Sequence, residues 1–228
     1  ATIDNDIGCT EYCIGYDTAL NTVKDAIDKI RDTATSHERC SVIEVMGRDA
    51  GYIAIETGIA LNAVGVALIE MPFDKEALYA KIKNLRAQGT QSFVVVVAEG
   101  MGGEFGEKLT KEIEANTGVE SRFVRPAHIV RGGTPTLRDR SLASVMGDKA
   151  VDLLLAGKSD LVICSRKDKI VATDIRWALI VDRMFKGKLK DGDLDSFSAE
   201  EIEAMKALCA ERRAYFEDMY DIMLTIGG

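Results

Sequence analysis

The pattern of apolar and polar positions predicts helices and strands that alternate along most of the chain. Val23, Ile27 and Ile30 recur at helical spacing among charged residues, which predicts a helix over about 17–35. Short β-prone runs follow at 41–46, 64–71, 93–98 and 119–124. The stretches between these runs predict helices at 51–61, 74–88 and 104–116.

The run Phe93–Ala98 is continuous and β-branched, which is typical of a strand that is buried on both faces of a parallel sheet. Strands that alternate with helices therefore indicate an α/β fold with a mostly parallel sheet. Toward the C-terminus we expect a helix at 141–155 and a pair of strands at 161–164 and 169–172. Two further helices are expected at 174–185 and 198–222. The polar, glycine-bearing stretch 186–193 is the best candidate for a linker.

Composition narrows the classes of protein to consider. The chain of 228 residues carries a net charge of −8, which repels a phosphate backbone and argues against nucleic-acid binding. No apolar run approaches the roughly 20 residues that span a bilayer, so we expect no membrane partner. The five cysteines form no dense framework and no metal set, and we interpret them as reduced thiols of a cytoplasmic protein.

Four polar clusters carry the candidate chemistry. Taken singly, each has an ordinary structural explanation, such as a turn for Asp-Asn-Asp, a surface arginine or a structural histidine. In chain order the clusters are Thr2-Ile3-Asp4-Asn5-Asp6, Met46-Gly47-Arg48, Glu99-Gly100 and the run from His128 to Pro135.

The placement of three clusters argues for one shared site. We expect Asp4, Met46-Gly47-Arg48 and Glu99 to lie at the ends of strands or just after them. In open α/β sheets, ligands bind outside the carboxyl ends of the strands. A carboxylate that follows four apolar residues, as Glu99 does, is also poorly explained by packing.

In this order, and together with Ile14–Thr22, the clusters resemble the 6-phosphofructokinase family, whose members phosphorylate fructose 6-phosphate on its 1-hydroxyl. The resemblance is dense from Thr2 to about Ala156 and thin beyond it. It implies the phosphofructokinase fold, with two Rossmann-like α/β lobes. The implied boundaries are 1–15 with 129–190 for the phosphoryl-donor lobe, 16–128 for the sugar-phosphate lobe, and 191–228 for a C-terminal helix region.

The resemblance also implies a role for each motif residue. Asp4 would be the base that removes the proton of the 1-hydroxyl, Thr2 and Arg48 would face the transferring phosphoryl group, and Asp6 would help to hold hydrated Mg²⁺. The sugar phosphate would be bound by Met46, Gly47, Glu99, His128 and Arg131, and by Arg39 and Arg122 donated from a neighbouring subunit. A homo-oligomer is therefore expected.

The resemblance leaves the phosphoryl donor open between ATP and pyrophosphate. The glycine-rich donor-binding segments of the family lie before the Thr2–Asp6 motif, so we expect the fold to be incomplete at the N-terminus and the isolated chain to be inactive. Ala1 stands where ATP-using members have Gly and pyrophosphate-using members have Lys. The run Met46–Tyr52 looks somewhat closer to pyrophosphate-using members. A non-catalytic sugar-phosphate-binding or regulatory module of the same fold is the alternative.

Overall fold

A computed structural model describes residues 1–35 and 38–226, with the backbone alone for 33–35. His37, which together with Cys40 makes too small a cluster to predict a metal site, lies outside the described residues. The chain divides into two compact units, each built from two separate stretches of sequence. The sheet unit comprises Asp17–Thr134 and Phe216–Gly228, and the hairpin unit comprises Ala1–Tyr16 and Pro135–Tyr215. The assignment of either unit to a donor or a sugar lobe stays a prediction.

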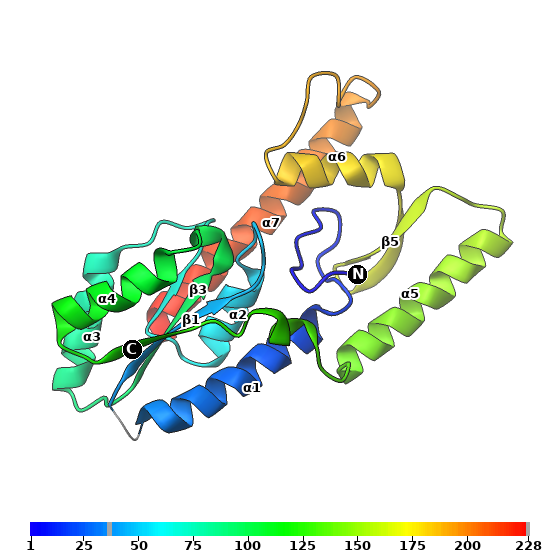
Figure 1. Ribbon diagram of the computed structural model, residues 1–228. Coiled ribbons are helices and arrows are strands. Elements are labelled where there is room, and N and C mark those ends of the chain that lie inside the picture. Colours follow the sequence, from blue (N-terminus) through cyan, green and yellow to red (C-terminus); the bar gives the residue numbers. More distant parts are fainter. Residues whose placement is uncertain (36–37, 227–228) are drawn as a thin grey trace. The chain divides into compact units, whose positions relative to one another are not determined.

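The sheet unit contains the expected parallel sheet (Figure 1). All three of its strand pairings are parallel, in the order β2-β3-β1-β4. Val45 at the end of β1 lies opposite Ala98 at the end of β3, so the residues that follow these two strands emerge side by side. The strands are β1 (Cys40–Val45), β2 (Gly65–Ala67), β3 (Phe93–Ala98) and β4 (Ser121–Val124).

Helices cover this sheet. Every residue of β1 and β3 is therefore buried, as the β-branched pattern predicts. Val42, Val95 and Val97 share one core cluster with apolar residues of α3 and α4, while α2 packs against β2 and β3. The helices of this unit are α1 (Tyr16–Thr35, whose first residue belongs to the hairpin unit), α2 (Tyr52–Ala60), α3 (Lys75–Ala87) and α4 (Phe105–Thr117). Short 3₁₀ turns follow β3 and β4: η1 (Glu99–Met101) and η2 (Ala127–Arg131).

One strand is shorter than its sequence pattern predicts. The apolar run 64–71 suggests eight residues of strand, but only Gly65–Ala67 pair with β3. After Ala67 the chain leaves the sheet, and Glu70 turns back so that its Oε1 accepts a hydrogen bond from the amide of Gly51 at 2.8 Å. That contact lies at the start of α2, so the run ends as a cap for a helix rather than as strand.

The hairpin unit holds the expected strand pair, β5 (Leu161–Arg166) and β6 (Lys169–Asp174), which is antiparallel. The other elements are α5 (Leu137–Leu155), α6 (Ile175–Phe185) and most of α7 (Ala199–Ile226). α5 begins four residues before the predicted start, because Thr136 accepts a hydrogen bond from the amide of Asp139 and caps the helix.

Segment 1–15 forms no strand in the described structure and instead runs as a loop within the hairpin unit (Figure 1). Cys9 joins a buried cluster with residues of β5, α6 and α7, such as Cys164, Val181 and Met205. The loop therefore has a core of its own to pack against. Within the described residues, no helix is both long enough and apolar enough to cross a lipid bilayer.

Candidate active site

The carboxyl ends of β1 and β3 bring two of the predicted clusters together. Glu99 is the first residue after β3, and its Oε1 accepts hydrogen bonds from the amides of Gly47 and Arg48, the former at 3.1 Å. The carboxylate thus fixes the loop that follows β1. Both bonds use the same oxygen, so the second oxygen, Oε2, is the one that a ligand hydroxyl can approach.

Glycine is required where this loop makes its closest approaches. Gly47 has a φ of +151°, and a Cβ placed there would come within 2.3 Å of the carbonyl oxygen of Ala50. A Cβ on Gly100 would come within 2.6 Å of the carbonyl oxygen of Arg48, which itself adopts a φ of +52°. The backbones of the two loops are therefore packed against each other, and Arg48 projects from a rigid turn rather than from a mobile one.

Arg125, a residue for which the sequence suggests no role, supports the same edge of the sheet. Its Nε lies 2.6 Å from Oε1 of Glu44 on β1, and its second nitrogen bonds both Oε2 of Glu44 at 3.2 Å and the carbonyl of Gly103 at 3.0 Å. The Glu44 side chain is only 8 % exposed. A buried carboxylate with a two-pronged arginine partner ties β1 to the loop that begins with Glu99.

His128 and Arg131 lie on η2, which follows β4 and contacts β1. Both side chains are exposed, and neither forms a hydrogen bond or ion pair with any part of the chain that the structure describes. The end of this turn is held by Thr22, whose hydroxyl donates to the carbonyl of Gly132 at 3.1 Å. Two donors with their polar atoms in solvent, on a fixed turn, suit the binding of an anion.

Arg39 and Arg122 lie at the opposite, amino-terminal edge of the sheet. Arg39 precedes β1, Arg122 pairs with Ser41 near the start of that strand, and both arginines form ion pairs with Glu120, Arg39 at 3.0 Å. β1 has six residues, so the two edges are about 20 Å apart at roughly 3.3 Å per residue. Within one chain these two arginines therefore cannot reach a ligand bound at Glu99.

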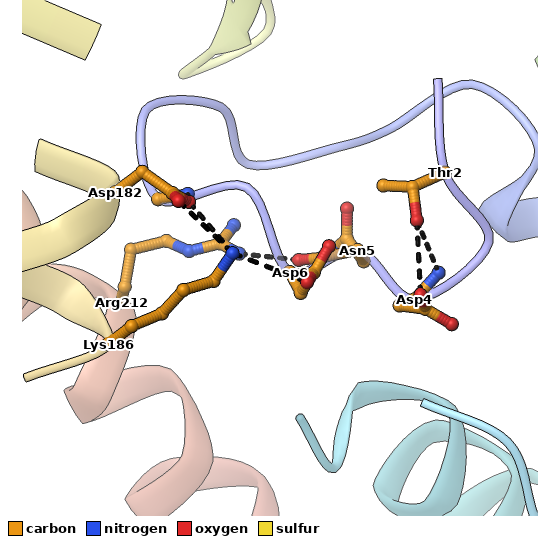
Figure 2. A network of polar contacts seen from close by, with 8 residues as sticks. Thr2, Asp4, Asn5, Asp6, Asp182, Lys186 and Arg212 are labelled. Atoms are coloured by element: carbon orange, nitrogen blue, oxygen red, sulfur yellow. Dashed lines mark hydrogen bonds and ion pairs between the residues drawn. The ribbon is translucent and has the colours of Figure 1, made fainter. Parts of the chain in front are cut away.

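The aspartate cluster belongs to the hairpin unit. The hydroxyl of Thr2 lies 3.3 Å from Oδ2 of Asp4 and accepts the amide of Asp4 at 3.2 Å, which closes a tight turn (Figure 2). Asp4 is buried and Asp6 is half-buried. The expectation that Asp4 follows a strand is wrong, because β1 is the first strand among the described residues.

Asp6 has a cation as its neighbour (Figure 2). Nζ of Lys186, the residue that caps the C-terminus of α6, lies 3.3 Å from Oδ2 of Asp6 and 3.1 Å from Asp182, which is one helical turn before it. Asp182 also accepts the amide of Gly8 at 3.0 Å. Burial lowers the pKa of Lys186, but the hydrogen bond to Asp182 and the charge of Asp6 outweigh it, so the pKa lies above its ordinary value. Lys186 is thus a cation at neutral pH.

Arg212 of α7 anchors the other half of the loop. Its guanidinium donates at 2.8 Å to the carbonyls of both Asn5 and Thr10, the former of which can be followed in Figure 2. The side chain of Asn5 then accepts the amide of Cys13 at 2.9 Å and donates to the carbonyl of Glu11 at 3.0 Å. Asn5 therefore organises the turn between two aspartates whose carboxylates are left to other partners.

Three of these anchoring residues are absent from the sequence prediction. Asp182 and Lys186 give a faint signal, since opposite charges four residues apart share a helix face. Arg212 gives a clearer one, because it continues the buried stripe of Met205, Cys209 and Phe216 on α7. An arginine in an apolar stripe needs buried acceptors, and here they are the backbone carbonyls of the loop.

Residue by residue, the structure joins Met46–Arg48 to Glu99 in the sheet unit, and Thr2 to Asp4 in the hairpin unit. It sets Arg39 and Arg122 apart at the far edge of the sheet. Within the described residues no group of three or more His, Cys, Asp or Glu side chains is arranged to hold a metal ion. That the Asp4 and Glu99 groups act on one substrate stays a prediction.

Comparison with known proteins places this arrangement in a family. Residues 1–154 match the sequence model of the family described as Phosphofructokinase. The chain is 51 % identical over 188 residues to "ATP-dependent 6-phosphofructokinase 1" of Clostridium perfringens, which covers 82 % of this chain and 58 % of that protein. It is 48 % identical over 190 residues to "ATP-dependent 6-phosphofructokinase" of Clostridium botulinum, covering 83 % of this chain and 59 % of that protein. The chain thus spans less than two thirds of these curated relatives.

Solved structures agree on the fold. The phosphofructokinase of Saccharomyces cerevisiae superposes with a TM-score of 0.77 at 26 % identity, over 91 % of this chain and 30 % of that one. A pyrophosphate-dependent phosphofructokinase of Nitrosospira multiformis gives a TM-score of 0.65 at 22 % identity over 76 % of this chain and 50 % of that one, which is a likeness of fold alone. With the family sequence pattern spread over both units, the chain belongs to the phosphofructokinase family.

Proposed function

We propose that the protein to which this chain belongs is a 6-phosphofructokinase, which transfers a phosphoryl group to the 1-hydroxyl of fructose 6-phosphate in glycolysis. The observation that carries the proposal is the Glu99 carboxylate bonded to the amides of Gly47 and Arg48, at the carboxyl edge of a parallel sheet. That edge is where open α/β folds bind their ligands. The chain presents there a fixed carboxylate, a rigid loop and an arginine.

ATP is the donor that we propose. The curated relatives at 48–51 % identity carry names that specify ATP dependence. The pyrophosphate-dependent structure is only 22 % identical, so it supports the fold and not the choice of donor. This preference outweighs the slight likeness of the Met46–Tyr52 run to pyrophosphate-using members.

In the reaction we assign the proton transfer to Asp4. As the general base it accepts the proton of the sugar's 1-hydroxyl while that oxygen attacks the donor phosphoryl group. Thr2 holds the carboxylate in place through the 3.3 Å contact of its hydroxyl with Oδ2 of Asp4. Arg48 stabilises the charge that develops on the transferring oxygens, and its rigid turn limits the freedom that it loses in doing so.

Fructose 6-phosphate is held by groups of opposite charge. His128 and Arg131 bind the 6-phosphate, since their exposed donors have no partner within the described residues and a planar guanidinium offers phosphate two hydrogen bonds at once. The Oε2 atom of Glu99 accepts a sugar hydroxyl while Oε1 keeps the loop in position. Because Oε1 already holds the carboxylate in place, Oε2 is positioned for the sugar before the sugar binds.

The protein works as a homo-oligomer in this proposal. Arg39 and Arg122 lie about 20 Å from the edge that carries Glu99, by the length of β1. They therefore serve the sugar phosphate of a neighbouring subunit, where they add positive charge to the 6-phosphate site. A glycolytic enzyme of this kind works in the cytoplasm, which is where we place it.

Asp6 is the residue that we expect to hold Mg²⁺. A lack of three clustered ligands among the described residues does not conflict with this role, because Mg²⁺ keeps several waters and binds one or two carboxylates plus substrate phosphates. Bound there, the ion would neutralise charge on the donor phosphates. Lys186, 3.3 Å from Oδ2 of Asp6, keeps the carboxylate oriented.

The test is a coupled assay of the whole protein with fructose 6-phosphate, ATP and Mg²⁺. Asp4→Asn keeps the shape of the side chain and removes the base, so kcat should fall by at least about 10²-fold, with a smaller change in KM. Asp168→Asn, at the exposed turn of the β5–β6 hairpin, is the matched control and should leave both constants unchanged. An unaltered kcat in Asp4→Asn would remove Asp4 from the base role.

The same assay separates the alternative function. If the whole protein binds fructose 6-phosphate in calorimetry but turns it over with neither ATP nor pyrophosphate, it is a sugar-phosphate-binding or regulatory module of this fold. Turnover with pyrophosphate and not with ATP would overturn the choice of donor and leave the acceptor chemistry intact.

A further inference from the structure

Two cysteines from the two separate stretches of the hairpin unit meet in its core. The Sγ atoms of Cys9 and Cys164 lie 3.6 Å apart, although 155 positions separate the residues in sequence. Both side chains are buried, at 2 % and 0 % exposure. A disulfide has an S–S distance of about 2.05 Å, so the two sulfurs need to approach by roughly 1.5 Å.

The backbone next to the pair is already fixed for such an approach. The amide of Ser165 donates to Oγ1 of Thr10, and the amide of Glu11 donates to the carbonyl of Ser165, both at 2.9 Å. The residue that follows each cysteine, Thr10 or Ser165, is therefore hydrogen-bonded to the segment that carries the other cysteine. Rotation of two side chains within a held backbone costs less than moving the chain.

Arg166 lies beside the sulfurs. Its Nε donates to the carbonyl of Cys9 at 2.7 Å, and its terminal nitrogen donates to the hydroxyl of Thr173 at 3.1 Å. The hydrogen bond shared with Cys9 lowers the pKa of Cys164 against the effect of burial, and the charge of Arg166 acts in the same direction. The same hydrogen bond raises the pKa of Cys9. The pair thus has one sulfur suited to be the thiolate and one that keeps its proton.

We propose that Cys9 and Cys164 form a covalent modification site, a dithiol that hydrogen peroxide oxidises to a reversible disulfide between the aspartate loop and β5. In the first step the Cys164 thiolate attacks one oxygen of the peroxide, the O–O bond breaks, and the departing hydroxide takes up the proton that Cys164 has released. The products are a sulfenic acid on Cys164 and one water.

In the second step Sγ of Cys9 attacks Sγ of Cys164 and the S–O bond of the sulfenic acid breaks. The hydroxyl leaves with the Cys9 proton as a second water. Overall, two thiols lose two electrons and one peroxide is reduced to two waters. Peroxide is close to water in size, so a brief local opening of the core admits it, whereas a bulky disulfide oxidant is excluded. A small dithiol such as dithiothreitol reverses the reaction.

The disulfide would tether the loop that carries Asp4 and Asp6 to the hairpin. It would close a loop of 155 residues, which removes a large amount of chain entropy from the unfolded state. We therefore expect the disulfide to raise the free energy of unfolding of the hairpin unit. This inference does not depend on the reaction proposed above.

The test is to treat the folded chain with a small molar excess of hydrogen peroxide, measure the intact mass, and then block and count the remaining thiols. We expect a loss of about 2 Da, which is the mark of one disulfide rather than of an oxygen adduct, together with loss of two of the five thiols. A non-reducing digest should contain a peptide pair joined through Cys9 and Cys164, and dithiothreitol should restore both thiols.

Variants sharpen the assignment. Cys9→Ser and Cys164→Ser should each abolish the mass loss, whereas Cys209→Ser, buried in the same cluster, should retain it. The digest of the unmutated chain decides the matter even if a variant fails to fold. A disulfide to any other cysteine, a gain of about 32 Da from sulfinic acid with no cross-link, or five intact thiols after treatment would each overturn the proposal.

Discussion

Nζ of Lys186 lies 3.3 Å from Oδ2 of Asp6 and neutralises it together with Asp182. Lys186→Met would leave two partly buried carboxylates facing each other without a cation. We expect the free energy of unfolding to fall by about 1–2 kcal/mol, between the values for exposed and buried pairs. The amide of Gly8, which donates to Asp182, should exchange its hydrogen faster. Urea denaturation and hydrogen exchange measured by mass spectrometry test both expectations.

The control for this prediction is Lys149→Met, which removes an exposed positive charge on α5 of the same unit. The raised pKa of Lys186 means that its contribution is complete at neutral pH and is lost only as the pH rises through that pKa, above the ordinary value of 10.5. A stability difference between Lys186→Met and the unmutated chain that shrinks between pH 6 and pH 8 would contradict this account.

Arg125 and Glu44 offer a second test, because the carboxylate is buried and the arginine is its bidentate partner. Arg125→Met should lower the free energy of unfolding by about 1–3 kcal/mol, since Glu44 is left with its charge unpaired. In a Glu44→Gln background the same change should cost much less. A double-mutant cycle in urea isolates the coupling. Additive costs would show that the pair contributes nothing.

The exposed ion pair of Arg122 with Glu120 serves as the comparison for that cycle. Its arginine side chain is 59 % exposed, so Arg122→Met should cost no more than about 1 kcal/mol. A larger loss than at Arg125 would mean that burial is not what sets the cost.

In the whole protein, Arg122 should matter for the substrate rather than for stability. Arg122→Ala removes a charge-assisted contact worth about 1.5–3 kcal/mol, so we expect KM for fructose 6-phosphate to rise at least about tenfold with a smaller effect on kcat. Steady-state kinetics test this, with the exposed Arg176→Ala as control.

Mixing the Arg122→Ala protein, which binds the sugar phosphate weakly, with the inactive Asp4→Asn protein tests whether subunits share a site. A mixed oligomer can assemble one site that has an intact Asp4 from one subunit and an intact Arg122 from its neighbour. Partial recovery of activity is therefore expected. No recovery in an oligomer verified as mixed would place Arg122 outside the neighbour's site.

Glu70 makes stability depend on pH. Burial raises its pKa above the ordinary value of 4.5, against the opposing hydrogen bond from the amide of Gly51. The folded chain then holds the Glu70 proton more tightly than the unfolded chain does. Stability from this group is therefore greatest below pH 4.5 and falls as the pH rises through the folded pKa.

Glu70→Gln removes this dependence and keeps an oxygen for the Gly51 amide. The urea midpoint of the variant should equal that of the unmutated chain at low pH and exceed it once the pH has risen through the folded pKa of Glu70. The exposed Glu76→Gln on α3 should show no such divergence. A constant offset between Glu70→Gln and the unmutated chain would disprove the assignment to burial.

Most of the fold can be predicted from the sequence because local patterns of apolar and polar residues encode it. The unbroken run Phe93–Ala98 requires burial on both faces, and that burial is observed. The pattern fails where a long-range contact takes over, as at Glu70, whose bond to Gly51 ends β2 early. The start of α5 is a different case, since Thr136 three residues before Asp139 is a local capping signal that the apolar pattern alone overlooks.

The candidate site divides in the same way. Contiguous motifs reveal Asp4 and Glu99, but nothing near Asp4 in sequence indicates that Lys186 and Arg212 hold its loop. Such contacts join residues that only the folded chain brings together. The two roles of Glu99, as a support for the Gly47 amide and as a candidate ligand group, are likewise visible only in three dimensions.

The bond between Arg212 and the carbonyl of Asn5, 207 positions apart, sets an order of events during synthesis. A ribosome that adds about 5–20 residues per second delivers Arg212 roughly 10–40 s after Asn5. Throughout that interval the aspartate loop has no guanidinium to bind its carbonyls. The residues proposed for proton transfer and metal binding are thus made well before the guanidinium that anchors their loop, so a nascent chain cannot complete this part of its structure until Arg212 has been added.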